Sequence, residues 1–424
     1  MGSFILENEV TIDGSIKILR RFSQDLKLEE NDFILTHGDQ LTVNRVIGSQ
    51  FQLQNEENNV NKLKNYLPIP GGFHLRWKFL KTIINHWWGD QHLPGSIAHA
   101  RIFLERIKRV DKKATHFSHA HDLVEDLLAA LLVSWNWKIN GKDEFNIEQL
   151  EIKVEELLNS IILESKGGNC EFEATLILAL LVYFDGHFST KLGDGEGIIR
   201  NEKLILLHLL GTKDSKNYKA TIARDLISCL YTLPPYYGYL SMHNRCVNLK
   251  GKEGYSKSVD HFVEHLVLLL KKSHTGGLSD ASLETLSLSL DLFMEMKNTI
   301  TDQIGGKQYK KHEKKANEKD ILELAKQIYD NSNNNSNRTP KNWKNITEEG
   351  WKNREWLVKF IERLKNEEDS DEINEEEDSD NEDNENEDKQ VKDKQVKDKQ
   401  VGDKQGEEEI DFDEIEDSFL WDDE

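Results

Sequence analysis

Cysteine is scarce in this chain, and the features that accompany secretion or membrane insertion are missing. The 424 residues contain three widely spaced cysteines, Cys170, Cys229 and Cys246, without a CxxC pair. This excludes a disulfide framework and a cysteine-rich zinc module, and is typical of a reduced intracellular protein. The longest apolar run, at 174–184, is about half a membrane span, and the N-terminus has no secretory pattern. We expect a soluble cytoplasmic or nuclear protein without a membrane partner.

The acidic charge of the chain is confined to its C-terminal end. Residues 366–424 carry 29 Asp and Glu against 6 Lys and Arg, a net charge of −23, and the rest of the chain sums to +1. The charge of the body therefore neither favours nor excludes nucleic acid. Residues 366–424 have too few apolar residues to offset the entropy of ordering, so we expect a disordered tail. Its last residues mix acids with aromatic residues, which is typical of segments that fold on a protein partner but also of solubilising tails.

Periodicity divides the body into a strand-containing part and a helical part. DFILTHGD (32–39) predicts a strand, and NYLPIPGGFHLRW (65–77) is a second apolar segment, which proline and glycine punctuate. Between about 97 and 330, apolar residues recur at intervals of three and four, as in amphipathic helices. We expect one helix-rich α/β or α+β domain over 1–330, with its strands between about 30 and 80.

Composition marks the end of this domain. GGKQYKKHEKKANEKD (305–320) is basic and predicts either a surface helix or an arm that contacts phosphates. An Asn-rich linker follows, which we place at 331–350. WKNREWLVKFIERLK (351–365) has the spacing of an amphipathic helix and precedes the acidic tail.

Two carboxylates beside glycines are the first candidates for chemistry. Asp39 follows the predicted strand and Gly38, an arrangement that can present a carboxylate to a divalent metal. Gly-Asp is also ordinary turn chemistry, in which the carboxylate bonds nearby backbone amides. Asp194 lies in GDGEG (193–197), where glycines allow a ligand to approach the backbone. A solvated loop between two helices has the same composition, so both alternatives stay open.

A second group of candidates combines histidine with carboxylates. SVDHFVEHL (258–266) places Asp260 and Glu264 on one face of a helix. That face can supply a metal ligand or a general base, or it can be solvated opposite an apolar stripe. His74 follows a turn at the start of a predicted helix, in PGGFHLRW, and is a catalytic candidate. The alternative is that its ring bonds the backbone there.

Other signatures are weak or missing. Three histidines in THFSHAHD have a spacing that can chelate zinc, but no cysteine or second histidine pair completes a tetrahedral set nearby: His116, His119 and His121. Ser-His-Asp, Rossmann, kinase and phosphate-loop signatures are not present. The tryptophans stand at apolar helical positions, where core packing explains them better than base stacking.

Five segments occur in an order that resembles the uncharacterised family called domain of unknown function 6589. They are TIDGSIKIL, THGDQLTVNR, PIPGGFHLRWKFLK, GDGEGIIRNEKLILLHLLG with NYKATIARDLI, and NRCVNLKGKEG with VDHFVEHL. The resemblance covers about residues 8–325, and GDQLTV (38–43) is its most specific motif. The family is found in fungi and cnidarians, and its members resemble proteins derived from mobile elements.

The resemblance implies a fold and a reaction. A mobile-element origin implies a ribonuclease H-like core with a large helical insertion and an Asp-Asp-Glu metal site. We map that site onto Asp39 after the first strand, Asp194 after the helical insertion and Glu264 on a late helix, with His74 as a further catalytic candidate. Such carboxylates would hold Mg²⁺ or Mn²⁺ for cleavage of DNA phosphodiesters.

The sequence also departs from this plan. Some members of the family carry an acidic residue where this chain has Gly72, and no recognisable DNA-binding module accompanies the motifs. The alternative to an enzyme is therefore a catalytically inactive, element-derived protein. Such a protein would bind DNA or another protein, with the acidic tail as its interaction segment.

Overall fold

The computed structural model describes residues 11–107, 109–141, 147–166, 170–212, 216–273, 318–333 and 343–369, together with Glu7, Glu9 and Ala316. Residues up to Asn353 form one compact unit, and α15 (Arg354–Asp369) belongs to a second unit. Most of the basic stretch at 305–320, and the acidic tail from 370 onward, lie outside the described residues.

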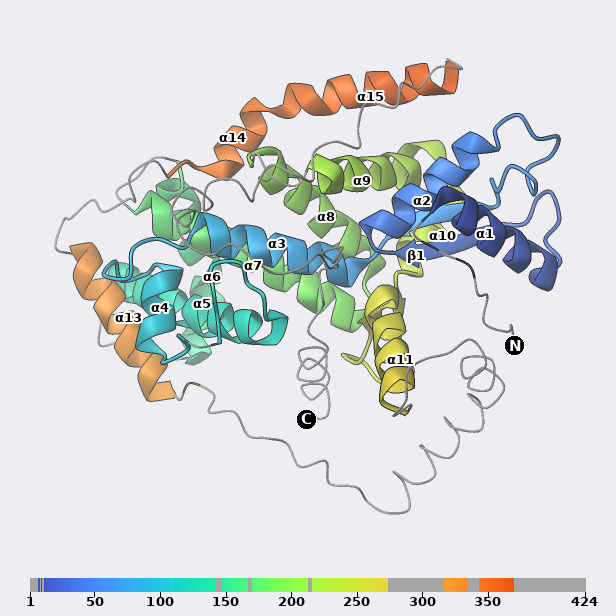
Figure 1. Cartoon of the computed structure of the whole chain (residues 1–424). Coiled ribbons are helices and arrows are strands. Elements are labelled where there is room, and N and C mark those ends of the chain that lie inside the picture. The colour runs from blue at the N-terminus through green and yellow to red at the C-terminus, as the bar shows by residue number, and fades with distance from the viewer. Residues whose placement is uncertain are drawn as a thin grey trace, which may run out of the picture. The chain divides into compact units, whose positions relative to one another are not determined.

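A β–α–β unit forms the N-terminal part of the chain. β1 (Ile34–Gly38) and β2 (Tyr66–Pro70) pair in parallel along their full length. Parallel strands need a crossover connection, which α2 (Gln40–Gln52) provides, and α1 (Ile12–Leu26) packs on α2 (Figure 1). A small apolar core joins these elements: Ile16, Leu19, Val46, Leu63 and Tyr66.

Helices build the larger part of the unit. Their bounds are α3 (Gly72–His86), α4 (Ile97–Phe103), α5 (Phe117–Asn140), α6 (Ile147–Glu164), α7 (Glu171–Leu192), α8 (Gly195–Leu210), α9 (Lys216–Ile227) and α10 (Pro235–His243). A π-helical turn, η1 (Ser228–Thr232), continues α9. Of the described helices, only α7 is long and apolar enough to span a membrane, and 67% of that stretch is buried inside the unit. This is the pattern of a central core helix, because a helix that is apolar all round is buried.

The C-terminal elements return to the helical part. β3 (Cys246–Val247) and β4 (Lys257–Ser258) form a short antiparallel hairpin that leads into α11 (Val259–Ser273). α13 (Glu318–Asn333) packs on α5, and α14 (Ile346–Lys352) packs on α8. Glycines allow this last contact, because a Cβ at Gly211 or Gly350 would collide with backbone of the facing segment.

The expected helix-rich fold is confirmed, with β1 and β2 in the range expected for strands. The linker expected at 331–350 overlaps the end of α13 and the start of α14. The helix expected at 351–365 is divided, because residues 351–352 end α14 and α15 begins at Arg354. The described strands form two separate two-stranded sheets, which do not establish a ribonuclease H-like core. That finer assignment stays a prediction.

Candidate functional site

The carboxyl ends of β1 and β2 bring the starts of two helices together. The backbone N–H of Gly71 donates to the carbonyl of Gly38 at 2.6 Å, so α2 and α3 begin at the same edge. Asp39 is the N-cap of α2, and its carboxylate accepts the N–H of Thr42 at 2.7 Å. The turn interpretation of Asp39 is therefore confirmed. The carboxyl ends of parallel strands are also where α/β proteins commonly bind ligands.

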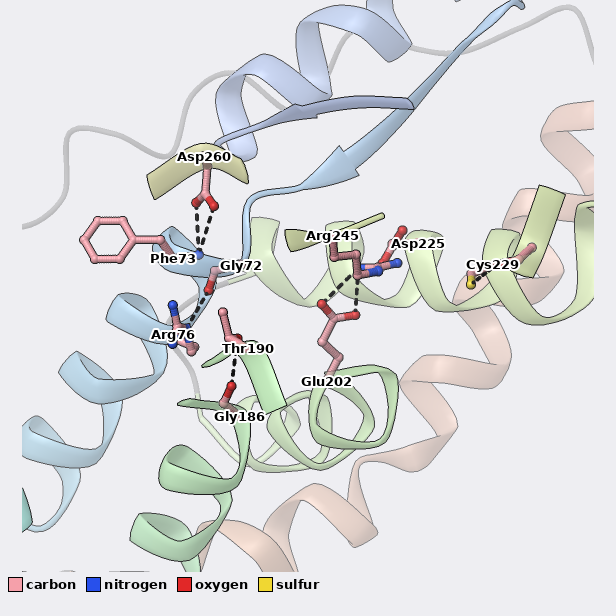
Figure 2. Close-up of polar contacts among 11 residues, drawn as sticks. Gly72, Phe73, Arg76, Gly186, Thr190, Glu202, Asp225, Cys229, Arg245 and Asp260 are labelled. Atoms are coloured by element: carbon pink, nitrogen blue, oxygen red, sulfur yellow. Dashed lines mark hydrogen bonds and ion pairs between the residues drawn. The ribbon is translucent and has the colours of Figure 1, made fainter. Parts of the chain in front are cut away.

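Asp260, from α11, occupies the start of α3. Its carboxylate accepts the N–H of Phe73 at 3.0 Å (Figure 2). It also accepts the N–H of His74 at 3.1 Å, and Asp260 is 5% exposed. The first N–H groups of a helix have no partner within the helix and attract an anion, which Asp260 supplies from within the chain. Gly71 leaves room for it, because a Cβ there would collide with Asp260 Oδ2.

His74 is held between two carboxylates of α11. Its Nδ1 lies 3.1 Å from Asp260 Oδ2, and its Nε2 lies 3.1 Å from Glu264 Oε1. Burial lowers the pKa of His74, but hydrogen bonds and charge from both carboxylates raise it to about 10. Burial likewise raises the pKa of Asp260, but the bonds and charge from His74 lower it below its ordinary value. We call His74, Asp260 and Glu264 the histidine clasp.

The histidine clasp decides between alternatives that the sequence left open for His74 and for the face that carries Asp260. The ring of His74 bonds carboxylates, so the idea that it bonds the backbone is wrong. The face that carries Asp260 is buried against α3, so it is not a solvated face. Because both ring nitrogens contact carboxylates of α11, His74 connects α11 to α3. A catalytic role for His74 stays a prediction.

The structure brings His74 and Glu264 together, and it gives Asp39 and Asp194 separate capping contacts. Asp194 is the exposed N-cap of α8, and its carboxylate accepts the N–H of Gly197 at 2.9 Å. Across the described ranges, no group of three or more His, Cys, Asp or Glu side chains is arranged to hold a metal ion. A site for Mg²⁺ or Mn²⁺ on Asp39, Asp194 and Glu264 stays a prediction, and no mechanistic step is derived through a metal.

A cavity of about 290 Å³ adjoins the histidine clasp. Its walls come from α3, α5, the end of α7, β4 with the residue before it, and α11. Phe73 contributes one face, and its ring lies 4.4 Å from that of His261 and 5.0 Å from that of Phe117. The remaining lining residues are Arg76, Ser118, His121, Asp122, Glu125, His187, Thr190, Lys191, Ser256 and Lys257.

Arg76 is the most deeply buried cation of this cavity, at 8% exposure. Its Nε donates to the carbonyl of Gly72 at 3.2 Å (Figure 2), and its Nη2 donates to the hydroxyl of Ser258 at 3.1 Å. Its Nη1 lies 3.5 Å from Nδ1 of His187. In the described part of the chain Arg76 forms no ion pair, so a buried guanidinium has only uncharged partners. Such a charge is costly to bury unless an anion compensates it.

The histidines of the cavity are held neutral. Burial, and then the charge of Arg76, lower the pKa of His121 to about 4, of His187 to about 2 and of His261 to about 3. Burial, together with Lys257 and Arg76, also lowers the pKa of Lys191 to about 8. At neutral pH the positive charge of the cavity is therefore carried by Arg76 and the two lysines.

A buried ion cluster positions the hairpin that leads to Asp260. The guanidinium of Arg245 donates to Glu202 of α8 at 3.0 and 3.2 Å and to Asp225 of α9 at 2.8 Å (Figure 2). The backbone carbonyl of Arg245 accepts the N–H of Val259, the first residue of α11. Arg245 thus connects the start of α11, through its backbone carbonyl, with α8 and α9, through its side chain.

The candidates from the sequence included Asp260 but not the three cations of the cavity, Arg76, Lys191 and Lys257. Arg76 had a signal, because it follows the candidate His74 by two residues. Lys191 and Lys257 had none, because a lysine that lines a cavity and a lysine on the surface look alike in a sequence.

The first prediction concerns Gly71. Gly71→Ala would place a Cβ against Asp260 and is expected to destabilise the protein by about 1–3 kcal/mol in urea unfolding. Gly48→Ala, in α2, is the control, because its Cβ would meet only the flexible end of Ile12 and helix propensity favours alanine by about 1 kcal/mol. Equal unfolding free energies for the two variants would contradict the seating of Asp260 on α3.

The second prediction concerns pH. The pKa of His74 is raised from 6.5 to about 10 in the folded state, so its stabilising contribution is complete below 6.5 and is lost as the pH rises through 10. The difference in unfolding free energy between wild type and His74→Gln should therefore shrink from pH 6 to pH 10.5. His92→Gln, at an exposed position, should show a difference near zero throughout. A constant gap for His74→Gln would show that the imidazolium is not what connects the two helices.

One family model matches this chain. It is described as a family of unknown function (DUF6589), and it matches residues 3–313. No curated protein and no solved structure matches the chain. The matched range includes the strand edge, the histidine clasp and every residue that lines the cavity. α13 and α14 lie beyond it, although they pack on helices within it. The chain belongs to the DUF6589 family of unknown function.

Proposed function

We propose that the protein binds a phosphate-bearing ligand in the cavity beside the histidine clasp, with DNA phosphodiesters as the ligand class. One observation carries the proposal: Arg76 is buried against the cavity with only uncharged partners in the described residues. A guanidinium is planar, permanently charged and matched to phosphate oxygens in geometry. An anion in the cavity would compensate the charge that the folded chain leaves buried.

Other lining groups support an anion. Lys191 and Lys257 add positive charge from α7 and β4. Ser256 adds a hydroxyl group, which commonly bonds phosphate oxygens together with arginine and lysine. The neutral histidines can each donate one N–H without repelling Arg76. A histidine that carried its own charge would oppose Arg76 in the absence of ligand.

The third prediction tests this cavity with inorganic phosphate. We expect wild-type protein to bind phosphate by calorimetry at low salt, and Lys257→Gln to weaken binding about tenfold, because a hydrogen bond to a charged group contributes about 1.5–3 kcal/mol. Arg76→Gln should weaken it at least as much. Because the pKa of Lys191 is about 8, affinity should fall between pH 8 and pH 9.5, where phosphate is already a dianion and only the lysine loses charge.

The control for these variants is Arg200→Gln. Arg200 is exposed on α8, where it pairs with Asp185, and it does not line the cavity. Its substitution should leave phosphate binding unchanged. Arg76→Gln removes a buried group, so Lys257→Gln, at a half-buried position, keeps the test valid if the first variant fails to fold. Phosphate binding that is unchanged in Lys257→Gln would refute the proposal.

Cleavage of DNA phosphodiesters is a second candidate. The position of Asp39 at the shared carboxyl edge of β1 and β2 favours it, since the backbone bond from Gly71 to Gly38 places Asp39 beside the start of α3. The alternative is a catalytically inactive protein, which binds DNA without cleaving it and uses the acidic tail to bind a protein partner. A mobile-element origin belongs with both candidates and rests on the resemblance alone.

The fourth prediction separates these two forms. Asparagine caps a helix as well as aspartate does, so Asp39→Asn should retain the fold. If the protein cleaves DNA, a nicking assay with Mg²⁺ or Mn²⁺ should show activity in wild type and a loss of at least about 100-fold in Asp39→Asn. Asp194→Asn, also an N-cap, is the matched comparison. Equal nicking by wild type and Asp39→Asn, or no nicking by either, would remove the catalytic role of Asp39.

A further inference from the structure

The charged side chains of the cavity are divided between its walls. The cations come from α3, α7 and β4: Arg76, Lys191 and Lys257. The carboxylates of Asp122 and Glu125 come from α5 alone, on the same helix as Phe117 and His121. Two carboxylates in one wall would repel a phosphate placed against them, so a phosphate alone does not account for this part of the lining. This division instead suits a ligand with an anionic end and a second end that carries hydrogen-bond donors.

From this division we propose that the cavity binds one nucleotide unit, with its phosphate at the cationic wall and its nucleoside against α5. This inference rests on the proposed phosphate binding and specifies the ligand of the same site. Carboxylates accept hydrogen bonds from the hydroxyl groups of a sugar and from the amino groups of bases. Asp122 and Glu125 therefore give the nucleoside end of the ligand polar partners that phosphate would not use.

Aromatic rings supply the second feature that a nucleoside needs. Phe73 and Phe117 both line the cavity, and their rings meet edge to face at 5.0 Å. Phe117 is also stacked with His121, whose ring centroid lies 6.0 Å away. Base–aromatic stacking tolerates any base, because every base has a π-face. The lining thus predicts recognition of a nucleotide with little sequence preference.

The size of the cavity determines the state of the nucleic acid. A volume of about 290 Å³ is at the lower limit of ligand pockets and fits a small ligand. Stacked base pairs cannot enter a space of this size. The nucleotide must therefore be the end of a strand, part of a single strand, or a unit turned out of a duplex, as in proteins that flip bases.

The fifth prediction compares four probes with the full-length protein by calorimetry. They are inorganic phosphate, a deoxynucleoside 5′-monophosphate, the same deoxynucleoside without phosphate, and deoxyribose 5-phosphate. The monophosphate should bind at least about tenfold more tightly than inorganic phosphate, because one stacked base contributes that much. Deoxyribose 5-phosphate should lie between the two, and the deoxynucleoside alone should bind more weakly than the monophosphate.

Variants on α5 show whether the nucleoside occupies the cavity. Phe117→Ala should reduce the affinity for the monophosphate to within about threefold of that for phosphate, and leave phosphate binding unchanged. Glu125→Gln, at an exposed position, should weaken the monophosphate only, and it remains informative if Phe117→Ala fails to fold. Phe22→Ala, at an exposed position on α1, is the matched control and should change neither affinity.

Each remaining outcome decides a different claim. Equal affinity for phosphate and the monophosphate would overturn the nucleotide assignment and leave phosphate binding intact. Tighter binding of the monophosphate that neither α5 variant reduces would also overturn it, because the nucleoside would then lie outside the cavity. No binding of either ligand would overturn both the nucleotide assignment and the proposed function.

Discussion

The site depends on one carboxylate seated at the start of one helix. Asp260 bonds the N–H groups of Phe73 and His74, from which it is separated by 187 and 186 residues of chain. It takes the place of an external anion at the N-terminus of α3 and orients the imidazolium of His74, which in turn binds Glu264. Removing this carboxylate would leave the buried imidazolium with Glu264 as its one remaining carboxylate partner, and it would leave the first N–H groups of α3 without an acceptor. Removing one partner of a buried ion pair is strongly destabilising, because the other charge stays buried.

The same arrangement explains why the next cation along α3 remains available. His74 and Arg76 both lie near the start of α3. The two acids of α11 that reach this region, Asp260 and Glu264, are bound to His74. Arg76 is left with a carbonyl, a hydroxyl and a neutral imidazole. The clasp thus occupies both carboxylates, and Arg76 has no carboxylate partner among the described residues. A carboxylate bound to Arg76 would neutralise the guanidinium and occupy the space beside it in the cavity.

The predictable part of the molecule is the part with local causes. Helices with apolar residues every three or four positions, the strand that ends at Gly38 and the caps at Asp39 and Asp194 follow from short-range physics, and the structure has them. The pairing of Asp260 and Glu264 on one helical face was also visible. Their shared partner, His74, could not be identified, because a contact between residues 186 positions apart leaves no periodic pattern in a single sequence. The lack of an ion pair at Arg76 among the described residues was hidden for the same reason, since it depends on which carboxylates are already bound.

Gly72 shows how a change of one residue alters the balance of charge at this site. A Cβ at Gly72 would lie 3.2 Å from the hydroxyl of Ser258, which itself accepts a bond from Arg76 at 3.1 Å. A carboxylate on such a side chain would therefore extend into the region of the guanidinium and compensate its charge. Glycine supplies no such carboxylate, and its own carbonyl accepts a hydrogen bond from Arg76 Nε. Gly72 is thus a position at which one acidic side chain would give Arg76 an ion pair, and glycine leaves Arg76 with a carbonyl and a hydroxyl instead.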